Sequence, residues 1–284
     1  MSHPVSGPRT SCPLDFSHIS RRPQPMRIIT FFSPKNGAGR TTTLMTLASE
    51  IVSASKDLML LDVPRQPFAA PEPFYSPLKA WGKLVANSWV GEGVVQTRIV
   101  GDMDGLLEAT NHAADKGFEY ILVDTPAQTY DFIGNVLALS DLIVVPATGT
   151  LEAALASDWF RQHPDLAENA FGLVTGILDT TEEKLTPAAF HSIPILQTRL
   201  PRCEAYRRQQ KEGHLYELAV ERRRFGMTED ERAIAGALEL YMEIEALLTG
   251  NRPETDYLSA RPLAADSPMA HLRVLLEQNS AFSK

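Results

Sequence analysis

From Met26 onward the chain alternates between short apolar runs and longer stretches in which apolar residues recur at helical spacing. The short runs predict strands, because near-continuous Val, Ile and Leu fit strands that are buried on both faces. The predicted strands cover residues 26–32, 58–63, 96–100, 120–124, 142–146, 171–178 and 193–198. Such strands, separated by amphipathic helices, indicate an α/β fold with a doubly wound, mostly parallel sheet.

The strand pattern stops near residue 203. Helices are expected near residues 203–212 and 228–248, where they would close the domain. Residues 64–77 carry too many prolines for a helix or a strand and predict a long loop after the second strand.

The two ends of the chain differ from its middle. Residues 1–25 hold five prolines and no sustained apolar period, which predicts a disordered leader. One principal domain is expected over residues 26–250. Residues 251–284 are interpreted as a linker that ends in one short amphipathic helix around Met269 and Leu272.

Composition narrows the class of protein. The net charge of −8 means that any contact with nucleic acid would need a local basic patch. Cys12 and Cys203 are far apart and predict neither a disulfide framework nor a zinc site. No apolar run approaches the roughly 18 residues of a membrane span, and the start of the chain lacks a signal-like apolar centre, so we expect a cytoplasmic protein.

A Gly-rich segment lies between the first predicted strand and the first predicted helix. It contains Gly37 and Gly39 and is followed by apolar residues at helical spacing from Leu44. Strand, Gly-rich loop and helix are the context of a phosphate-binding loop, in which backbone N–H groups and a helix N-terminus hold a polyanion. A tight turn without a ligand is the alternative interpretation.

Two carboxylates lie at or near the ends of predicted strands. Asp124 ends the predicted strand 120–124, and Asp62 lies near the end of strand 58–63. From the carboxyl edge of a parallel sheet such a side chain can orient the shell of a Mg²⁺ ion, to which Thr41 would contribute its hydroxyl. For either Asp alone, a cap at the end of a strand is the plainer interpretation.

Together these residues resemble the ParA/MinD superfamily of P-loop ATPases. The run from Lys35 to Thr42 is similar to the deviant Walker A motif of that superfamily, Asp62 to the Asp that opens its second motif, and Tyr120–Pro126 to its Walker B motif. Residues 195–202 resemble the segment near the nucleotide base. Residues 116–120 and 211–215 look most like the VirC-type ParA-like proteins that promote T-DNA processing.

The resemblance implies an ATP-dependent homodimer that uses Mg²⁺. Lys35 would reach the partner's phosphates, Asp62 would position the attacking water, and these two residues with Asp124 would form the catalytic set. Mg²⁺ would be held by Thr41, Asp62 and Asp124. The implied nucleotide contacts are Lys35, Asn36, Gly37, Ala38, Gly39, Arg40, Thr41, Thr42, Pro201 and Arg202.

Three residues depart from the family pattern. Arg40 replaces the compact ammonium of a Lys with a bulky planar fork, so hydrolysis is expected to be weak or absent. Asn36 replaces a Gly and is expected to be tolerated because Asn enters left-handed conformations. Pro64 lies where many relatives have a second Asp.

A basic group follows the last predicted strand. Such a group fits sequence-tolerant contacts to DNA phosphates, which the resemblance favours. A solvated helix face paired with Glu204, Glu212, Glu217 and Glu221 is the alternative. Trp81 and Trp89 could form a partner surface or belong to the core. The predicted DNA-binding residues are Arg199, Arg207, Arg208, Lys211, Arg222, Arg223 and Arg224.

Three functions remain open. The first is a switch acting on DNA in plasmid partition or in conjugative or T-DNA-type transfer, with a relaxosome or centromere-binding component as protein partner. The second is a MinD-like ATPase that positions itself at a membrane or cell pole, although residues 268–279 carry Arg273 as their one basic side chain apart from histidine. The third is a hydrolysis-deficient nucleotide-binding scaffold that recruits a relaxase or another partner. Nucleoid or pole association within the cytoplasm stays open.

Overall fold

The computed structural model describes residues 25–65, 76–88, 90–128, 130–177, 180–222 and 228–250. Their strands form one sheet of seven in the order β3-β2-β4-β1-β5-β6-β7, and every pair is parallel. The predicted doubly wound α/β fold is confirmed. The strands are β1 (Arg27–Phe31), β2 (Leu58–Asp62), β3 (Val95–Ile99), β4 (Tyr120–Asp124), β5 (Leu142–Ala147), β6 (Ala170–Ile177) and β7 (Ile195–Pro201).

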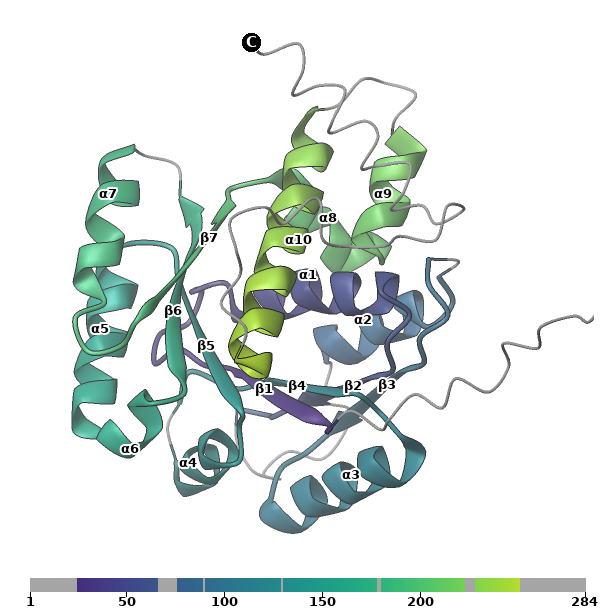
Figure 1. Cartoon of the computed structure of the whole chain (residues 1–284), viewed down its shortest axis with the longest axis horizontal. Coiled ribbons are helices and arrows are strands. Elements are labelled where there is room, and N and C mark those ends of the chain that lie inside the picture. The colour runs from purple at the N-terminus through teal and green to yellow at the C-terminus, as the bar shows by residue number, and fades with distance from the viewer. Residues whose placement is uncertain are drawn as a thin grey trace, which may run out of the picture.

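Helices cover both faces of the sheet (Figure 1). We call the side of α1, α2, α8, α9 and α10 the α1 face, and the side of α3 to α7 the α5 face. The helices are α1 (Arg40–Ser53), α2 (Pro77–Val85), α3 (Met103–Lys116), α4 (Asp131–Ala138), α5 (Thr150–Gln162), α6 (Pro164–Ala167), α7 (Thr180–Ala189), α8 (Glu204–Glu212), α9 (Leu215–Arg222) and α10 (Thr228–Thr249).

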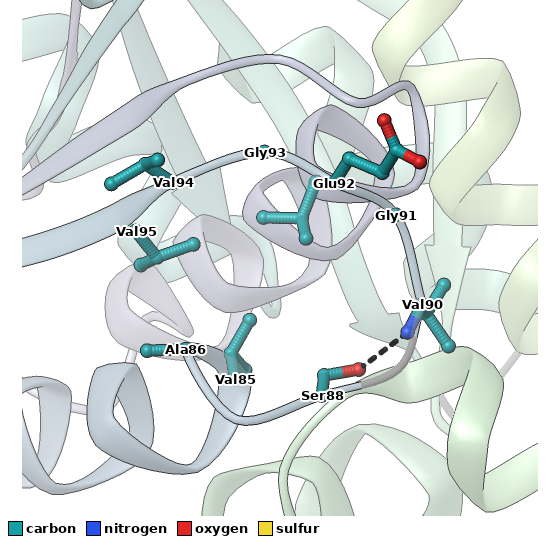
Figure 2. Close-up of a pocket in the computed structure, with 10 residues that line it drawn as sticks. Val85, Ala86, Ser88, Val90, Gly91, Glu92, Gly93, Val94 and Val95 are labelled. Atoms are coloured by element: carbon teal, nitrogen blue, oxygen red, sulfur yellow. Dashed lines mark hydrogen bonds between the residues drawn. The ribbon is translucent and has the colours of Figure 1, made fainter.

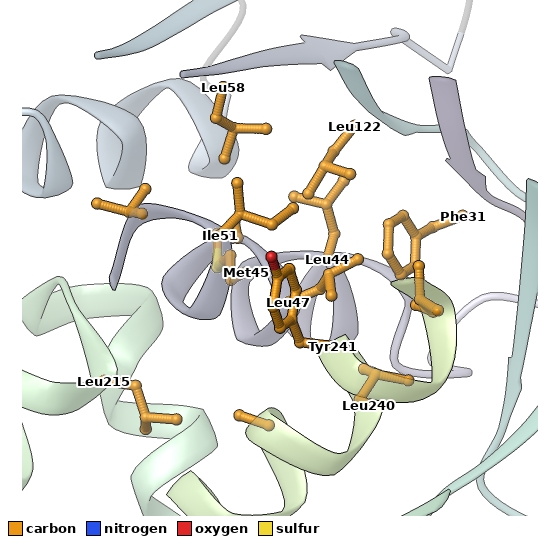
Figure 3. Close-up of a cluster of buried hydrophobic side chains, with 14 of the residues drawn as sticks. Phe31, Leu44, Met45, Leu47, Ile51, Leu58, Leu122, Leu215, Leu240 and Tyr241 are labelled. Carbon is orange, nitrogen blue, oxygen red and sulfur yellow. The ribbon is translucent and has the colours of Figure 1, made fainter. Parts of the chain in front are cut away.

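Each face has its own apolar cluster, and the strands supply both. In β2, Leu58 and Leu60 belong to the cluster of the α1 face, whereas Met59 and Leu61 belong to that of the α5 face. Successive side chains of a strand point to opposite faces, so a strand covered on both sides must be apolar throughout. Figure 3 shows α1 in the first cluster, with Leu44 and neighbouring side chains lying among residues of the sheet and of α10.

Several boundaries differ from the sequence prediction. Strand β7 starts two residues later and ends three residues later than predicted, and helix α9 was not predicted. β7 is an edge strand whose exposed and buried residues alternate, so polar side chains obscure its end. The predicted leader, the linker, the short C-terminal helix, Trp89 and most of the loop over 64–77 lie outside the described residues.

Trp81 belongs to the core. Its side chain is fully buried, and its indole Nε1 donates a hydrogen bond to the carbonyl oxygen of Gly213 at 3.1 Å. This indole therefore joins α2 to the segment after α8. None of the described helices has the length and apolar character that crossing a bilayer requires.

Candidate functional site

The Gly-rich loop joins β1 directly to α1. Gly37 and Gly39 have φ angles of 80° and 89°, in the left-handed region that suits glycine. A Cβ on Gly39 would also lie 3.2 Å from Thr175 Oγ1. Asn36 does not have a positive φ, because Ser55 is the one described residue other than Gly that does. The expectation that Asn36 is tolerated through a left-handed conformation is therefore wrong.

The N-terminus of α1 opens onto this loop. Gly39 is the N-cap and provides no side-chain cap, and the first helical hydrogen bond runs from Thr43 N to Gly39 O at 2.8 Å. The backbone N–H groups of Arg40, Thr41 and Thr42 precede that bond, where a helix has no intrahelical acceptors. An anion would meet these groups and the positive end of the helix dipole.

Asp62 and Asp124 lie side by side at the carboxyl ends of their strands. They are register partners on β2 and β4, and Asp124 is also the register partner of Phe31, the last residue of β1. The hydroxyl of Thr41 donates to Asp124 Oδ2 at 2.5 Å. Three predicted site residues from distant parts of the sequence are therefore brought to one edge of the sheet.

The environment of Asp124 suits a hard cation. Its Oδ1 is buried and has no hydrogen-bond partner within the described part of the chain. The pKa of Asp124 is raised to about 7, chiefly by burial and also by the neighbouring Asp62, against the lowering effects of the hydrogen bond from Thr41 and of the charge of Arg40. A buried carboxylate oxygen without a donor, beside a hydroxyl, matches the oxygen ligands that Mg²⁺ prefers.

Asp62 is held by a residue that the sequence did not indicate. The hydroxyl of Ser76 donates to Asp62 Oδ2 and accepts from the backbone N–H of Lys79 at 2.8 Å as the N-cap of α2. Burial raises the pKa of Asp62, and the bond from Ser76 lowers it. The start of α2 is therefore attached to the carboxylate that stands beside Asp124.

Arg40 turns back onto the loop. Its Nη1 donates to the carbonyl oxygen of Ser33 at 2.8 Å, and burial lowers the pKa of its guanidinium while Asp124 opposes that effect. The guanidinium of Arg40 is thus hydrogen-bonded to the backbone at the start of the loop.

Lys35 lies at the surface of the loop. Its ammonium forms an ion pair with Glu152 in the first turn of α5, with side chains 37% and 13% exposed. Glu152 was not among the predicted residues, and 117 positions separate it from Lys35. The pair places Lys35 at the boundary between the loop and the α5 face.

The α1 face reaches the loop through α8. Gln210 Nε2 donates to Thr42 Oγ1 at 2.5 Å, and Gln209 Nε2 donates to Thr46 Oγ1 at 2.8 Å. By contrast, Pro201 ends β7, which is three strands away from β1, and Arg202 is exposed just beyond it. These two predicted residues share the carboxyl edge of the sheet with the loop but lie toward its far end.

The predicted basic residues do not form one exposed group. Arg199, Arg207 and Lys211 are exposed, and Arg207 pairs with Glu204. The structure corrects the place predicted for Arg208 in an exposed DNA-binding group. Its side chain is 10% exposed and forms ion pairs with Glu212 and Asp230, so it faces the interior and is not available to DNA. Nothing is described of the side chain of Arg222, and Arg223 and Arg224 lie outside the described residues.

A separate pocket of about 310 Å³ lies at the other end of α1 (Figure 2). It is lined mainly by valines, including Val52 of α1 and Val85 of α2, and by the segment that leads into β3. It contains none of the predicted site residues.

Comparisons with known proteins agree with this geometry. The model of the VirC1 protein family matches residues 26–247. The virC1 protein of Rhizobium rhizogenes is 26% identical over an alignment of 204 residues, and the match covers 67% of this chain and 83% of that protein.

Two solved structures show the fold. The septum site-determining protein MinD with Mg-ADP from Pyrococcus horikoshii OT3 has a TM-score of 0.54 at 12% identity and covers 81% of this chain and 100% of its own. A ParA family ATPase from Chlorobium tepidum TLS has a TM-score of 0.51 at 13% identity and covers 76% and 98%. The resemblance drawn from the sequence is confirmed: the chain belongs to the VirC1 family and has the α/β fold of ParA and MinD proteins.

Proposed function

We propose that this chain is a nucleotide-gated dimerisation switch. It binds ATP with Mg²⁺ at residues 35–42, pairs with a second copy of itself, and acts on DNA in plasmid partition or in conjugative or T-DNA-type transfer. The observation that carries the proposal is the loop before α1, where the N–H groups of the first helical turn, which has no side-chain cap, lie beside the Thr41–Asp124 pair. Membership of the VirC1 family supports it.

The nucleotide would be held mainly by backbone. The two left-handed glycines allow phosphates to approach, and the first turn of α1 supplies N–H donors. Thr41 and Asp124 would hold the Mg²⁺, which neutralises charge that develops on the phosphates during their transfer. Asp62, next to Asp124 on the neighbouring strand, would orient a water.

Hydrolysis is expected to be slow. Arg40 stands where a Lys would reach the outer phosphates, and its guanidinium is bound to the carbonyl of Ser33. That observation favours a second candidate, a scaffold of the same architecture that binds ATP without turnover. In either case the state with bound ATP would be long-lived.

Dimerisation would use Lys35. Its side chain is 37% exposed at the rim of the loop, so a second copy could approach it, and the ammonium would then exchange Glu152 for the partner's phosphates. Two polyanionic ligands that face each other need cations from both protomers, which makes nucleotide a condition for the dimer.

Contact with DNA would involve the exposed cations of β7 and α8. Arg207 and Lys211 lie on the helix that is bound to Thr42, close to the nucleotide site. Contacts of this kind to phosphates would be weak in sequence preference and sensitive to salt.

The test is size-exclusion chromatography with light scattering, in Mg²⁺ and either ATP or ADP. The native protein should form dimers with ATP and remain monomeric with ADP, and Lys35→Ala should remain monomeric with both. Lys83→Ala, an exposed lysine of α2, is the matched control and should behave as the native protein. A native protein that binds ATP and stays monomeric would exclude the switch.

A second measurement separates the switch from the scaffold. ATP hydrolysis is followed with and without DNA for the native protein and for Arg40→Lys. Turnover that rises with DNA supports the switch. Turnover seen only in Arg40→Lys supports the scaffold.

A further inference from the structure

Two consecutive glutamines of α8 contact the first turn of α1. Gln209 Nε2 donates to the carbonyl oxygen of Thr42 at 3.3 Å and to Thr46 Oγ1 at 2.8 Å, and Gln210 Nε2 donates to Thr42 Oγ1 at 2.5 Å. Both amides therefore donate to the same residue: Gln209 to the carbonyl oxygen of Thr42, and Gln210 to its hydroxyl.

The first amide fixes the helix. Gln209 is fully buried, and Tyr206, one turn earlier, donates from its hydroxyl to Ala233 O of α10 at 2.9 Å. A buried amide with two acceptors holds α8 in register with α1, because leaving those groups unbonded away from water is costly. The position of the neighbouring Gln210 is thereby set by the fold.

The second amide is different because it is exposed. An amide nitrogen carries two N–H groups, so Gln210 can donate to Thr42 Oγ1 and still offer a second donor. Thr42 lies in the turn of α1 whose backbone N–H groups precede the first helical bond. An oxyanion seated on that turn and bound by the hydroxyl of Thr42 would therefore lie close to the carboxamide of Gln210.

We propose that Gln210 is a nucleotide-binding residue, whose carboxamide donates to the phosphate oxygen that Thr42 holds. This inference rests on the proposed function, since it assigns α8 as one wall of that nucleotide site. Because Arg207 and Lys211 belong to the same helix, a bond from Gln210 to the ligand would join the nucleotide directly to the helix that carries these exposed cations.

The experiment measures the affinity of the full chain for ATP, ADP and GTP by calorimetry in Mg²⁺. Gln210→Ala should weaken ATP and ADP by about tenfold, as expected for loss of one hydrogen bond to a charged group. Gln210→Glu should weaken them further, because a carboxylate replaces a donor beside a phosphate. Gln162→Ala and Gln162→Glu, at the exposed end of α5, are the matched controls and should bind as the native protein.

Each outcome either supports or overturns the contact between Gln210 and the phosphate. Equal losses for ATP, ADP and GTP support the phosphate contact, whereas a loss confined to the adenine nucleotides overturns it in favour of a contact with the base. Unchanged affinity in both Gln210 variants, with circular dichroism and unfolding midpoints like the native protein, removes Gln210 from the site. If Gln210→Glu does not fold, Gln210→Ala decides alone. If the native protein itself binds no nucleotide, the proposed function fails and this inference fails with it.

Discussion

The two faces of the sheet are packed in different ways. On the α5 face, the fully buried polar side chains within the described helices are the hydroxyls of Ser157 and Thr186. The α1 face buries groups that are charged or form several hydrogen bonds, namely Glu50, Arg208, Gln209, His214 and Asp230. One face is therefore held chiefly by apolar area, and the other also by directional bonds.

Those bonds join α1 to the C-terminal helices. Tyr216 donates from its hydroxyl to Glu50 Oε1 at 2.6 Å, and the ring of His214 lies 2.9 Å from the carbonyl oxygen of Ser49. Apolar contacts tolerate small displacements, whereas a buried hydrogen bond that is displaced leaves polar atoms unpaired. A movement of α1 would therefore be passed to α8 and α9 more directly than to α5.

The largest effect on unfolding free energy is expected for the apolar clusters, which both faces of the sheet have. Leu60→Ala and Leu61→Ala change adjacent, fully buried residues of β2, one in each cluster. Each should lower the free energy of unfolding by about 2–5 kcal/mol, because both leave a cavity in close-packed surroundings. Urea denaturation measures both. A loss below about 1 kcal/mol for Leu61→Ala alone would show that the α5 face closes around the gap and that the faces differ in packing as well as in polarity.

The next effect separates two neighbouring arginines of α8. Arg208→Ala should cost about 3 kcal/mol of unfolding free energy, because it removes a cation from the buried Asp230. Arg207→Ala breaks the exposed pair with Glu204 and should cost less than about 1 kcal/mol. Thermal and urea unfolding test the pair of variants. Similar costs would mean that Arg208 reaches solvent in solution and belongs with the exposed cations after all.

A third effect depends on pH. Burial lowers the pKa of His214 to about 4 from an ordinary 6.5. Between these values the unfolded chain binds the proton and the folded chain does not, so the stability that His214 contributes is complete above pH 6.5 and is lost as the pH falls toward 4. The contribution of His214 should fall by about 2 kcal/mol between pH 7.5 and pH 5, whereas the raised pKa of Asp124 stabilises the folded state as the pH falls through the same range.

The check is unfolding free energy against pH for the native protein, for His214→Gln and for His191→Gln, an exposed histidine after α7. His214→Gln should remove the contribution of His214, so that the unfolding free energy at pH 5, relative to that at pH 7.5, is about 2 kcal/mol higher than in the native protein, whatever the variant's own cost in stability. His191→Gln should keep the native difference. An unchanged difference in His214→Gln would assign the acid sensitivity to other groups.

The smallest effect concerns single hydroxyls. Thr46→Val removes one of the two acceptors of Gln209 Nε2 and should cost about 1 kcal/mol. Thr110→Val, on α3, removes a hydroxyl that donates to Leu106 O of its own helix and should cost less than about 0.5 kcal/mol. Equal costs, measured by chemical denaturation, would show that the bond between Gln209 and Thr46 adds nothing to the free energy of unfolding beyond what a hydrogen bond within one helix contributes.

Local sequence patterns were enough to predict the fold, the loop before α1 and the two carboxylates beside it. The loop before α1 needs glycine at two positions close in sequence, and Asp62 and Asp124 each end an apolar strand, so neighbouring residues carry the information. The contact between Gln210 and Thr42 joins positions 168 residues apart, and no local pattern contains it.

The arginines of α8 show a second limit. Arg207 and Arg208 are adjacent in sequence and look alike as charges, yet one side chain is 71% exposed and the other 10%. Successive residues on a helix point in directions about a quarter-turn or more apart, so their exposure depends on where α10 packs. A count of basic residues therefore overestimates the charge available to a polyanion.

The register of the central strands has a consequence for how such chains can change over evolutionary time. Asp62 and Asp124 are partners in adjacent strands of five residues each. Deleting or inserting one residue within either strand would turn its terminal carboxylate to the opposite face and exchange its apolar residues between the two clusters. Descendants of this chain are therefore expected to gain and lose residues in the connections between elements, while the lengths of β2 and β4 stay constant.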